Sequence, residues 1–452
     1  MRVDSSRLRS AMHNEEELFV RLHPRSEEIA GSHVSNLLSG VPMPWMSRWP
    51  GAFPLTVAEA RGSSFVDVDG IEYVDFCLGD TGAMTGHGLG VVAEALAGQA
   101  AKGITTMLPS PDAGWVAVEL ERRFGLPKWQ IAMSATDANR FVLRLARMLT
   151  GRPKVCVMDW CYHGTVDETL AVLDSKGKVV SRPGAIGPQV DPALTTRVVP
   201  FNDLDALEAA LAVGDVACVL MEPALTNIGI VLPDAGYLNR VREMTRDFGS
   251  LLVIDETHTI CVGPGGCTRE WGLEPDFFVI GKPIGGGMPV AAYGMTAEVA
   301  DRIEASISRD DVDVSGIGGT LTGNALALAA VRATLSSTLT RADFDKTIPL
   351  AAAWAEGVRS AYEPCGLDWH VQQLGCRAEY WFSSPPRNGA QAAAAIDHEL
   401  DAFFHLFCLN RGILMTPFHN MALMSPFHTI DQIERHTSVF ADALNALGVD
   451  HP

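Results

Sequence analysis

The sequence lacks the features that mark membrane and nucleic-acid-binding proteins. No apolar run reaches the roughly 18 residues that a membrane-spanning helix needs, and the first 25 residues have no apolar signal core. Basic residues are few, because 35 Lys and Arg stand against 54 Asp and Glu, a net charge of −19. Phosphates repel such an acidic chain, so we expect neither a nucleic-acid partner nor a membrane partner. The composition predicts a soluble, cytoplasmic protein.

Motifs for several common chemistries are also missing. Nine cysteines are scattered along the chain, and the closest pairs, Cys156/Cys161 and Cys261/Cys267, do not have zinc-site spacing. We therefore expect buried thiols and no metal site. The sequence contains no Gly-x-x-x-x-Gly-Lys-Ser/Thr phosphate loop, no Gly-x-Ser-x-Gly elbow and no His-Glu-x-x-His pair.

An alternation of short apolar runs and helical patterns fills the middle of the chain, from about residue 90 to 330. The apolar runs cover 155–158, 216–221, 251–254 and 277–280, and the helical patterns include 204–211 and 238–248. This alternation predicts an α/β fold with a mostly parallel sheet that is covered on both faces. The length of 452 residues allows two to three domains.

The two ends of the chain have a different pattern. Residues 1–40 are expected to be helical, and alternating residues on both sides of Asp69-Gly70 predict a β-hairpin over 64–76. After residue 340, a helix is expected from Pro349 to Tyr362, followed by strands and helices of an α+β segment.

Two charged residues follow neighbouring apolar runs, where an open α/β sheet binds its ligands. Asp255 follows the run 251–254, and Lys282 follows 277–280 ahead of the glycines 285–287. A partly desolvated lysine can act as a nucleophile, and a buried carboxylate can hold a cation. The pair suits pyridoxal phosphate, with Lys282 as the Schiff base and Asp255 on the pyridine nitrogen. The alternative is a solvated loop lysine and a helix N-cap.

Three further segments are candidates for cofactor contacts. Ser134, Ala135 and Thr136 open an apolar helix and could cradle a phosphate, although the spacing alone favours a plain N-cap by Ser134 or Thr136. Tyr162 could stack on a flat ring, or it could be an ordinary core aromatic. Thr320 lies in a Gly-rich turn that could contact a phosphate or could be only a turn.

These residues together resemble the class III, fold-type I pyridoxal-phosphate aminotransferases. The resemblance is nearest to the branch that contains glutamate-1-semialdehyde aminomutase and β-amino-acid transaminases, and 280–290 is its most specific segment. It implies a fold-type I α/β architecture with a mostly parallel, seven-stranded sheet in a large domain (86–335). A smaller α+β domain would be built from both chain ends (1–85 and 336–452), and the assembly would be a homodimer.

The resemblance also implies a role for each site residue. Lys282 would bind the cofactor and shuttle the proton between substrate Cα and cofactor C4′, Asp255 would keep the ring nitrogen protonated, and Tyr162 would stack on the ring. His258 would hydrogen-bond the phenolic oxygen, Ser134, Ala135 and Thr136 would hold the phosphate, and Thr320 would reach the phosphate of the partner subunit.

The chain departs from the family pattern at four places. Ala135 replaces a glycine of the phosphate loop, and Thr257 replaces a valine. The segment 39–46 lacks the carboxylate-binding Ser and Arg of the aminomutase, and 415–420 lacks the late Arg of the β-amino-acid branch. Arg377 or Arg48 could supply a carboxylate contact instead. The segment 39–46, with Pro, Trp and Met, suits an apolar or aromatic substrate group.

The leading hypothesis is a transaminase that moves an amino group between an amine or amino acid and a keto acid. The alternative is an isomerase with the same cofactor, either a glutamate-1-semialdehyde-type aminomutase or an amino-acid racemase. A third hypothesis is a binding protein that keeps only the fold.

Overall fold

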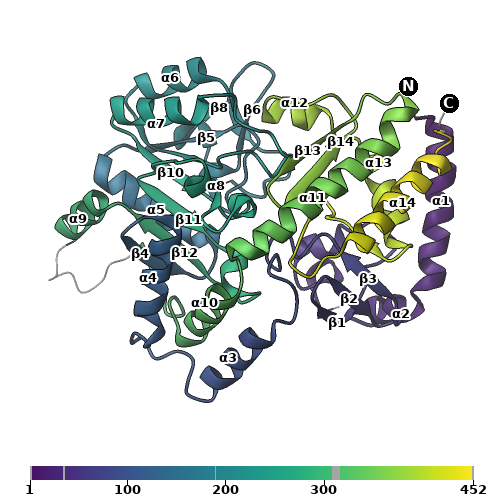
Figure 1. Ribbon diagram of the computed structural model, residues 1–452. Helices are drawn as coiled ribbons and strands as arrows, with labels where there is room; N and C mark the ends of the chain where they lie inside the picture. The colour runs from purple at the N-terminus through teal and green to yellow at the C-terminus, as the bar shows by residue number, and fades with distance from the viewer. Residues whose placement is uncertain (1–2, 34–35, 189, 308–315, 450–452) are drawn as a thin grey trace. The chain divides into compact units, whose positions relative to one another are not determined.

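The computed structural model describes residues 3–33, 36–188, 190–307 and 316–449 (Figure 1). The chain forms two compact units. Unit 1 comprises Met1–Leu89, Ala342–Pro385 and Ala395–Pro452, and therefore combines both ends of the chain. Unit 2 comprises Gly90–Arg341 and Pro386–Ala394.

Unit 2 is organised around a seven-stranded sheet, counted over the described residues, with the order β4-β12-β11-β10-β9-β5-β8. The strands are β4 (Lys128–Ala132), β5 (Lys154–Met158), β8 (Thr196–Val199), β9 (Val216–Met221), β10 (Leu251–Asp255), β11 (Phe277–Ile280) and β12 (Ala291–Met295). Neighbouring strands from β8 to β11 run parallel, whereas β12 is antiparallel to both β11 and β4. The predicted mostly parallel, seven-stranded sheet is confirmed.

The central strands form because their sequences are mostly apolar, with Asp255 at the end of β10 as the charged exception. Every residue of β9, β10, β11 and β12 is buried, as expected for strands that are covered on both faces. The helices of this unit are α3 (Gly90–Ala100), α4 (Asp112–Phe124), α5 (Ala135–Thr150), α6 (Leu204–Ala212), α7 (Tyr237–Asp247), α8 (Gly266–Glu270), α9 (Ala297–Ser306), α10 (Ala325–Ser337) and α12 (Gly389–Ala394). Helix α5 packs on β4, β9, β11 and β12, and α7 packs on β10.

Short elements connect these layers. They are the hairpin β6 (Ala171–Leu173) and β7 (Val179–Ser181) and the 3₁₀ turns η3 (Asp167–Thr169), η4 (Pro192–Leu194), η5 (Thr259–Val262) and η6 (Lys282–Gly285). In the parallel register, Asp255 pairs with Val279, so β10 and β11 end at the same edge of the sheet. This edge is where η5 and η6 begin.

Unit 1 contains the predicted hairpin. Strands β1 (Val57–Arg61), β2 (Ser64–Asp67), β3 (Glu72–Asp75) and β15 (Ile413–Leu414) form one sheet, and β13 (His370–Leu374), β14 (Arg377–Trp381) and β16 (Met421–Leu423) form another. The helices are α1 (Ser5–Leu22), α2 (Pro24–His33), α11 (Arg341–Tyr362), α13 (His398–Leu409) and α14 (Ile430–Ala446), with 3₁₀ turns η1 (Leu38–Gly40), η2 (Pro44–Ser47) and η7 (Glu363–Cys365).

Helix α11 begins earlier than predicted. The expectation placed the helix start at Pro349, but the helix begins at Arg341 and carries Pro349 inside it. Proline lacks the N–H that an interior helical position donates, which is why it is a common N-terminal signal. The buried side chains of Phe344 and Thr347 precede the proline and anchor the first turns of this helix by packing.

Candidate active site

A buried carboxylate marks the carboxyl end of β10. Asp255 is 4% exposed, and its Oδ2 accepts hydrogen bonds from His163 Nδ1 at 2.9 Å and from Asn139 Nδ2 at 2.9 Å. Its Oδ1 accepts from the Thr257 backbone N–H at 3.0 Å. The donors come from helix α5, from the loop after β5 and from the turn that follows β10, so three segments hold one side chain.

These contacts keep Asp255 ionised. Burial by itself raises the pKa of a carboxyl group, but the hydrogen bond and charge of His163, with the Thr257 and Asn139 contacts, lower the pKa of Asp255 to about 2. Burial opposes a charge on His163, yet its negatively charged surroundings, among them the Asp255 carboxylate, raise the pKa of the imidazole well above its ordinary value. The result is a buried ion pair at the strand end.

Lys282 follows β11 in a strained backbone conformation. It begins η6 with a φ of 46°, in the left-handed region that side-chain-bearing residues rarely occupy. Such strain, of order 1–3 kcal/mol, is found at functional sites where the surrounding structure imposes it. Lys282 Nζ lies 2.7 Å from His258 Nε2, so the two residues that follow neighbouring strands meet.

Two glycines bring the other predicted segments to the same place. A Cβ atom added to Gly281 would come within 3.0 Å of Ala135 Cβ, so the lysine segment lies against the first turn of α5. A Cβ atom on Gly164, whose φ is 82°, would come within 2.1 Å of Thr136 Oγ1. The Thr165 N–H also donates to Thr136 Oγ1 at 3.2 Å. The segments 134–136, 162–165 and 281–282 therefore converge.

The N-terminus of α5 combines a cap with an amide-rich turn. Ser134 is the N-cap, and its Oγ accepts from the Asp137 N–H at 3.2 Å, which is the cap that the sequence offered as the alternative. Ala135 is the first helical residue and is not among the described residues with positive φ. The glycine that the family pattern has at this position is therefore not needed for backbone freedom here.

The remaining predicted residues lie as follows. Tyr162 is half-buried next to His163, and Thr320 is exposed in the turn ahead of α10. In unit 1, Arg377 is 1% exposed on β14, and its Nη2 lies 3.4 Å from Asp80 Oδ1, whereas Arg48 is exposed. The roles predicted for Tyr162 and Thr320, and a carboxylate contact by Arg377 or Arg48, stay predictions.

Sequence reasoning missed the two residues that hold Asp255. His163 follows Tyr162 directly, and Asn139 lies on the buried face of α5, between Ala138 and Phe141. A fully buried asparagine on an otherwise apolar helix face was the available signal. Glu256, beside Asp255, instead accepts four hydrogen bonds from Thr259, Cys267 and Thr268 and so fixes the turn after β10.

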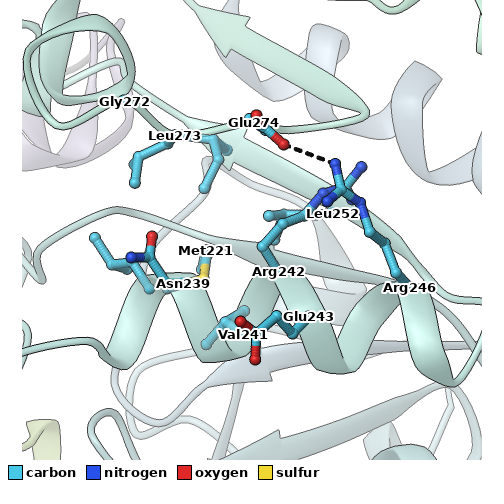
Figure 2. A pocket seen from close by; sticks show the side chains of 12 residues that line it. Met221, Asn239, Val241, Arg242, Glu243, Arg246, Leu252, Gly272, Leu273 and Glu274 are labelled. Carbon is cyan, nitrogen blue, oxygen red and sulfur yellow. Dashed lines mark hydrogen bonds and ion pairs between the residues drawn. The ribbon is translucent and has the colours of Figure 1, made fainter.

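Two pockets are lined by residues other than Lys282, Asp255 and the segment 134–136. Figure 2 shows a pocket of about 230 Å³ between α7, β10 and the loop at residues 272–274, with an ion pair between Arg246 and Glu274 at 2.7 Å. A larger apolar cavity of about 630 Å³ belongs to unit 1, and its lining includes Pro42 and Met46. Among the described residues, no group of His, Cys, Asp or Glu side chains is arranged to hold a metal ion.

No helix within the described ranges is both long and apolar enough to span a membrane. All nine cysteine side chains are buried, as predicted.

The converging residues fit pyridoxal phosphate. The ionised, buried carboxylate of Asp255 suits the protonated pyridine nitrogen of the cofactor, and the Lys282 amine suits its aldehyde carbon. Backbone N–H groups at the start of a 16-residue helix suit its phosphate. The close approach of Gly281 to Ala135 brings the amine-bearing segment near the helix terminus. Lys282, Asp255, Ser134, Ala135 and Thr136 are the residues that would hold the cofactor.

Known proteins resemble this chain over most of its length. The sequence model of the class-III aminotransferases matches residues 45–359. The chain is 34% identical to a glutamate-1-semialdehyde 2,1-aminomutase of Sorangium cellulosum over 443 residues, which is 94% of this chain and 97% of that protein.

Solved structures give the same result. A glutamate-1-semialdehyde aminomutase from Pseudomonas aeruginosa PAO1, also known in complex with PMP, is 49% identical, with a TM-score of 0.96 and coverage of 98% of this chain and 99% of that chain. An omega-transaminase from Sphaerobacter thermophilus is 27% identical, with a TM-score of 0.84 and coverage of 94% and 98%. The chain belongs to the class III aminotransferase family of pyridoxal-phosphate-dependent enzymes.

Proposed function

We propose that this chain is an isomerase of the aminomutase type, which moves an amino group within one substrate molecule. The observation that carries the proposal is the convergence of Lys282, the ionised Asp255 and the N-terminus of α5 in a chain whose relatives at 34% and 49% identity are named aminomutases. This replaces the transaminase as the leading hypothesis, since the named transaminase relative is only 27% identical.

Each residue has a defined task in this reaction. Pyridoxal phosphate, when bound, supplies an electron sink that acidifies the hydrogen on the amine-bearing carbon. Lys282 Nζ would take that proton and return it at cofactor C4′, and Asp255 would keep the ring nitrogen charged by its own negative charge. The first turn of α5 would hold the phosphate with backbone N–H groups, and Tyr162 would stack on the ring.

A single-substrate assay tests the proposal. The purified full-length protein, loaded with pyridoxal phosphate, is incubated with glutamate-1-semialdehyde and no keto acid. The products are then separated by chromatography and their masses are measured by mass spectrometry. An aminomutase converts the substrate to an isomer of the same mass without an acceptor. Strict dependence on an added keto acid would exclude the aminomutase, and failure to retain the cofactor would favour a binding protein that keeps only the fold.

A transaminase is the second candidate, favoured by one feature of unit 1. The segment 39–46 carries neither the Ser nor the Arg that the aminomutase resemblance calls for, and its residues Pro42 and Met46 line an apolar cavity. A bidentate contact between arginine and a carboxylate has no apolar substitute. Apolar amines offered with pyruvate or 2-oxoglutarate as acceptors distinguish this candidate, because only a transaminase consumes the acceptor.

We further propose that the enzyme is a cytoplasmic homodimer in which Thr320 of one subunit contacts the phosphate of the other. The exposure of Thr320 in its turn leaves the side chain accessible to a second subunit. Sedimentation velocity of the wild type and of Thr320→Ala would test the dimer and the phosphate contact together. If Thr320 contacts the partner's phosphate, the variant should remain a dimer but retain the cofactor less strongly.

A further inference from the structure

The contact between Lys282 and His258 is built by two anchored segments. Lys282 is held at a φ of 46° directly after β11, and His258 is the residue before η5, in the turn that the hydrogen bonds of Glu256 fix. The side-chain nitrogens are 2.7 Å apart, which is within hydrogen-bonding distance. Both residues are half-buried, so protein surrounds part of the contact.

A contact of this length requires one hydrogen between the two nitrogens. Two positive charges at such a distance repel strongly, and two nitrogens without a shared hydrogen also repel. One hydrogen between the two nitrogens satisfies this contact, and double protonation is disfavoured because like charges repel. Interacting groups of this kind titrate as a unit and not as two separate residues.

Three buried titratable groups at this edge of the sheet are hydrogen-bonded to residues other than Lys282. His163 is paired with Asp255, and Glu256 accepts from Thr259, Cys267 and Thr268. Glu222, which follows β9, accepts from Thr226, and Tyr162 lies beside His163 after β5. His258 is a titratable side chain that is hydrogen-bonded to the Lys282 amine.

We propose that His258 is the proton-exchange partner of Lys282 and holds the proton that the amine must give up before it reacts. In this step an N–H bond at Lys282 Nζ breaks, an N–H bond at His258 Nε2 forms, and the positive charge moves from lysine to histidine. After Nζ has taken a proton from the substrate carbon, the same step passes a proton to His258 Nε2, and its reverse gives the proton back to Nζ for return to the substrate. This inference deepens the proposed function and rests on it for its catalytic meaning, but the proton exchange is measurable without substrate.

The test measures the reactivity of Lys282 in the full-length chain freed of cofactor. Trace acetic anhydride acylates uncharged amines, and mass spectrometry compares Lys282 with the exposed Lys176 as an internal reference between pH 5 and 10. Pyridoxal phosphate should block the labelling of Lys282. In the wild type, the shared proton leaves a fixed fraction of Nζ uncharged, so reactivity should level off below about pH 9 instead of falling tenfold per pH unit.

His258→Gln provides the matched comparison, because glutamine can still accept a hydrogen bond from Nζ but cannot take its proton. Lys282 should then be at least tenfold less reactive at pH 7 than in the wild type, and its reactivity should fall tenfold for each unit of pH. Superimposable wild-type and His258→Gln profiles would overturn the proposal. Because no substrate is present, that outcome leaves the proposed aminomutase activity untouched.

A reciprocal measurement covers the case in which His258→Gln fails to fold. Diethyl pyrocarbonate acylates neutral imidazole, and the pH midpoint for labelling His258 is compared between the wild type and Lys282→Met, with the exposed His13 as the reference. Removal of a coupled lysine should shift the midpoint by at least half a pH unit while His13 is unchanged. An unshifted midpoint would also overturn the proposal.

Discussion

Two buried groupings of histidine and aspartate, one in each unit, are assembled in different ways. In unit 2, His163 contacts Asp255 directly at 2.9 Å. In unit 1, the hydroxyl of Tyr73 stands between the two residue types, 2.7 Å from His23 Nε2 and 3.0 Å from Asp67 Oδ2. The imidazoles are equally inaccessible, at 1% and 0% exposure. Burial therefore does not decide which histidine is charged.

The two aspartates differ in how far along the chain their hydrogen-bond donors lie. Asp67 accepts from Asp69, Ile71 and Tyr73, all within its own hairpin. Asp255 accepts from residues 92 and 116 positions away. Burial lowers the pKa of His23 by more than the nearby Asp67 carboxylate raises it, whereas around His163 the charges and hydrogen bonds outweigh burial and raise the pKa. The carboxylate of unit 1 closes a turn, and that of unit 2 maintains a charge where three segments meet.

The largest effect is expected from the lysine of unit 2. Lys282→Ala should lower turnover by about 10⁴-fold, the upper end of what an acid–base group contributes. Borohydride should fix pyridoxal phosphate to the wild-type chain and not to the variant, as measured by intact mass. Lys346→Ala in unit 1, which removes a bond to the Pro426 carbonyl, is the control and should keep full turnover. Equal turnover of the wild type and Lys282→Ala would contradict the proposed role of Lys282 in the reaction.

Replacing each of the two aspartates with asparagine should affect a different property of the protein. Asp255→Asn should lower turnover by roughly 10²–10³-fold, because a preorganised charge on the cofactor is lost. Asp67→Asn should lower the free energy of unfolding by about 1–3 kcal/mol through its weakened hairpin contacts, with turnover per folded molecule unchanged. Steady-state kinetics and urea unfolding measure both. If Asp67→Asn also lost turnover selectively, the contrast between the units would fail.

Acid should destabilise unit 1 before unit 2. Burial lowers the pKa of His405 and His428 to about 4 and that of His436 to about 3, so the unfolded chain binds more protons below about pH 6.5. Stability is therefore lost as the pH falls from 6.5 towards 4, by about 3 kcal/mol for each such histidine. Burial raises the pKa of Asp401 to about 6, which acts in the opposite sense and offsets part of this loss.

The ion pair of unit 2 has a different pH window. The lowered pKa of Asp255, about 2, contributes stability above pH 3.8 that is lost only as the pH falls through 2. The raised pKa of His163 contributes stability that is complete below pH 6.5 and is lost at high pH. Hydrogen-exchange mass spectrometry between pH 7 and 4 should find earlier opening in peptides of unit 1. Simultaneous opening of both units would contradict this assignment.

The smallest effect is expected at the helix start in unit 2. Ala135→Gly restores the family residue, but Ala135 already has a negative φ, so cofactor affinity should change less than threefold. The glycine should cost about 0.5–1 kcal/mol of helix stability. Fluorescence titration with pyridoxal phosphate and thermal unfolding measure the two quantities. A large gain in affinity would mean that the phosphate cradle needs glycine's freedom after all.

The local parts of both units could be predicted from the sequence. The apolar runs at 216–221, 251–254 and 277–280 became β9, β10 and β11, because fully buried strands need no polar residues. The Asp69-Gly70 step predicted the hairpin of β2 and β3. The early start of α11 could not be predicted, because packing of Phe344 overrides the local signal of Pro349.

The sequence by itself determined the α/β sheet, the hairpin that Asp67 closes, and the placement of Asp255 and Lys282 after neighbouring strands. These features depend on the chemistry of adjacent residues and on the two periodicities of the backbone. The tertiary structure decided that Asn139 and His163 hold Asp255 and that His258 meets Lys282. Those contacts join residues that are tens of positions apart, and only the packing of α5 and the strand ends brings them within hydrogen-bonding distance.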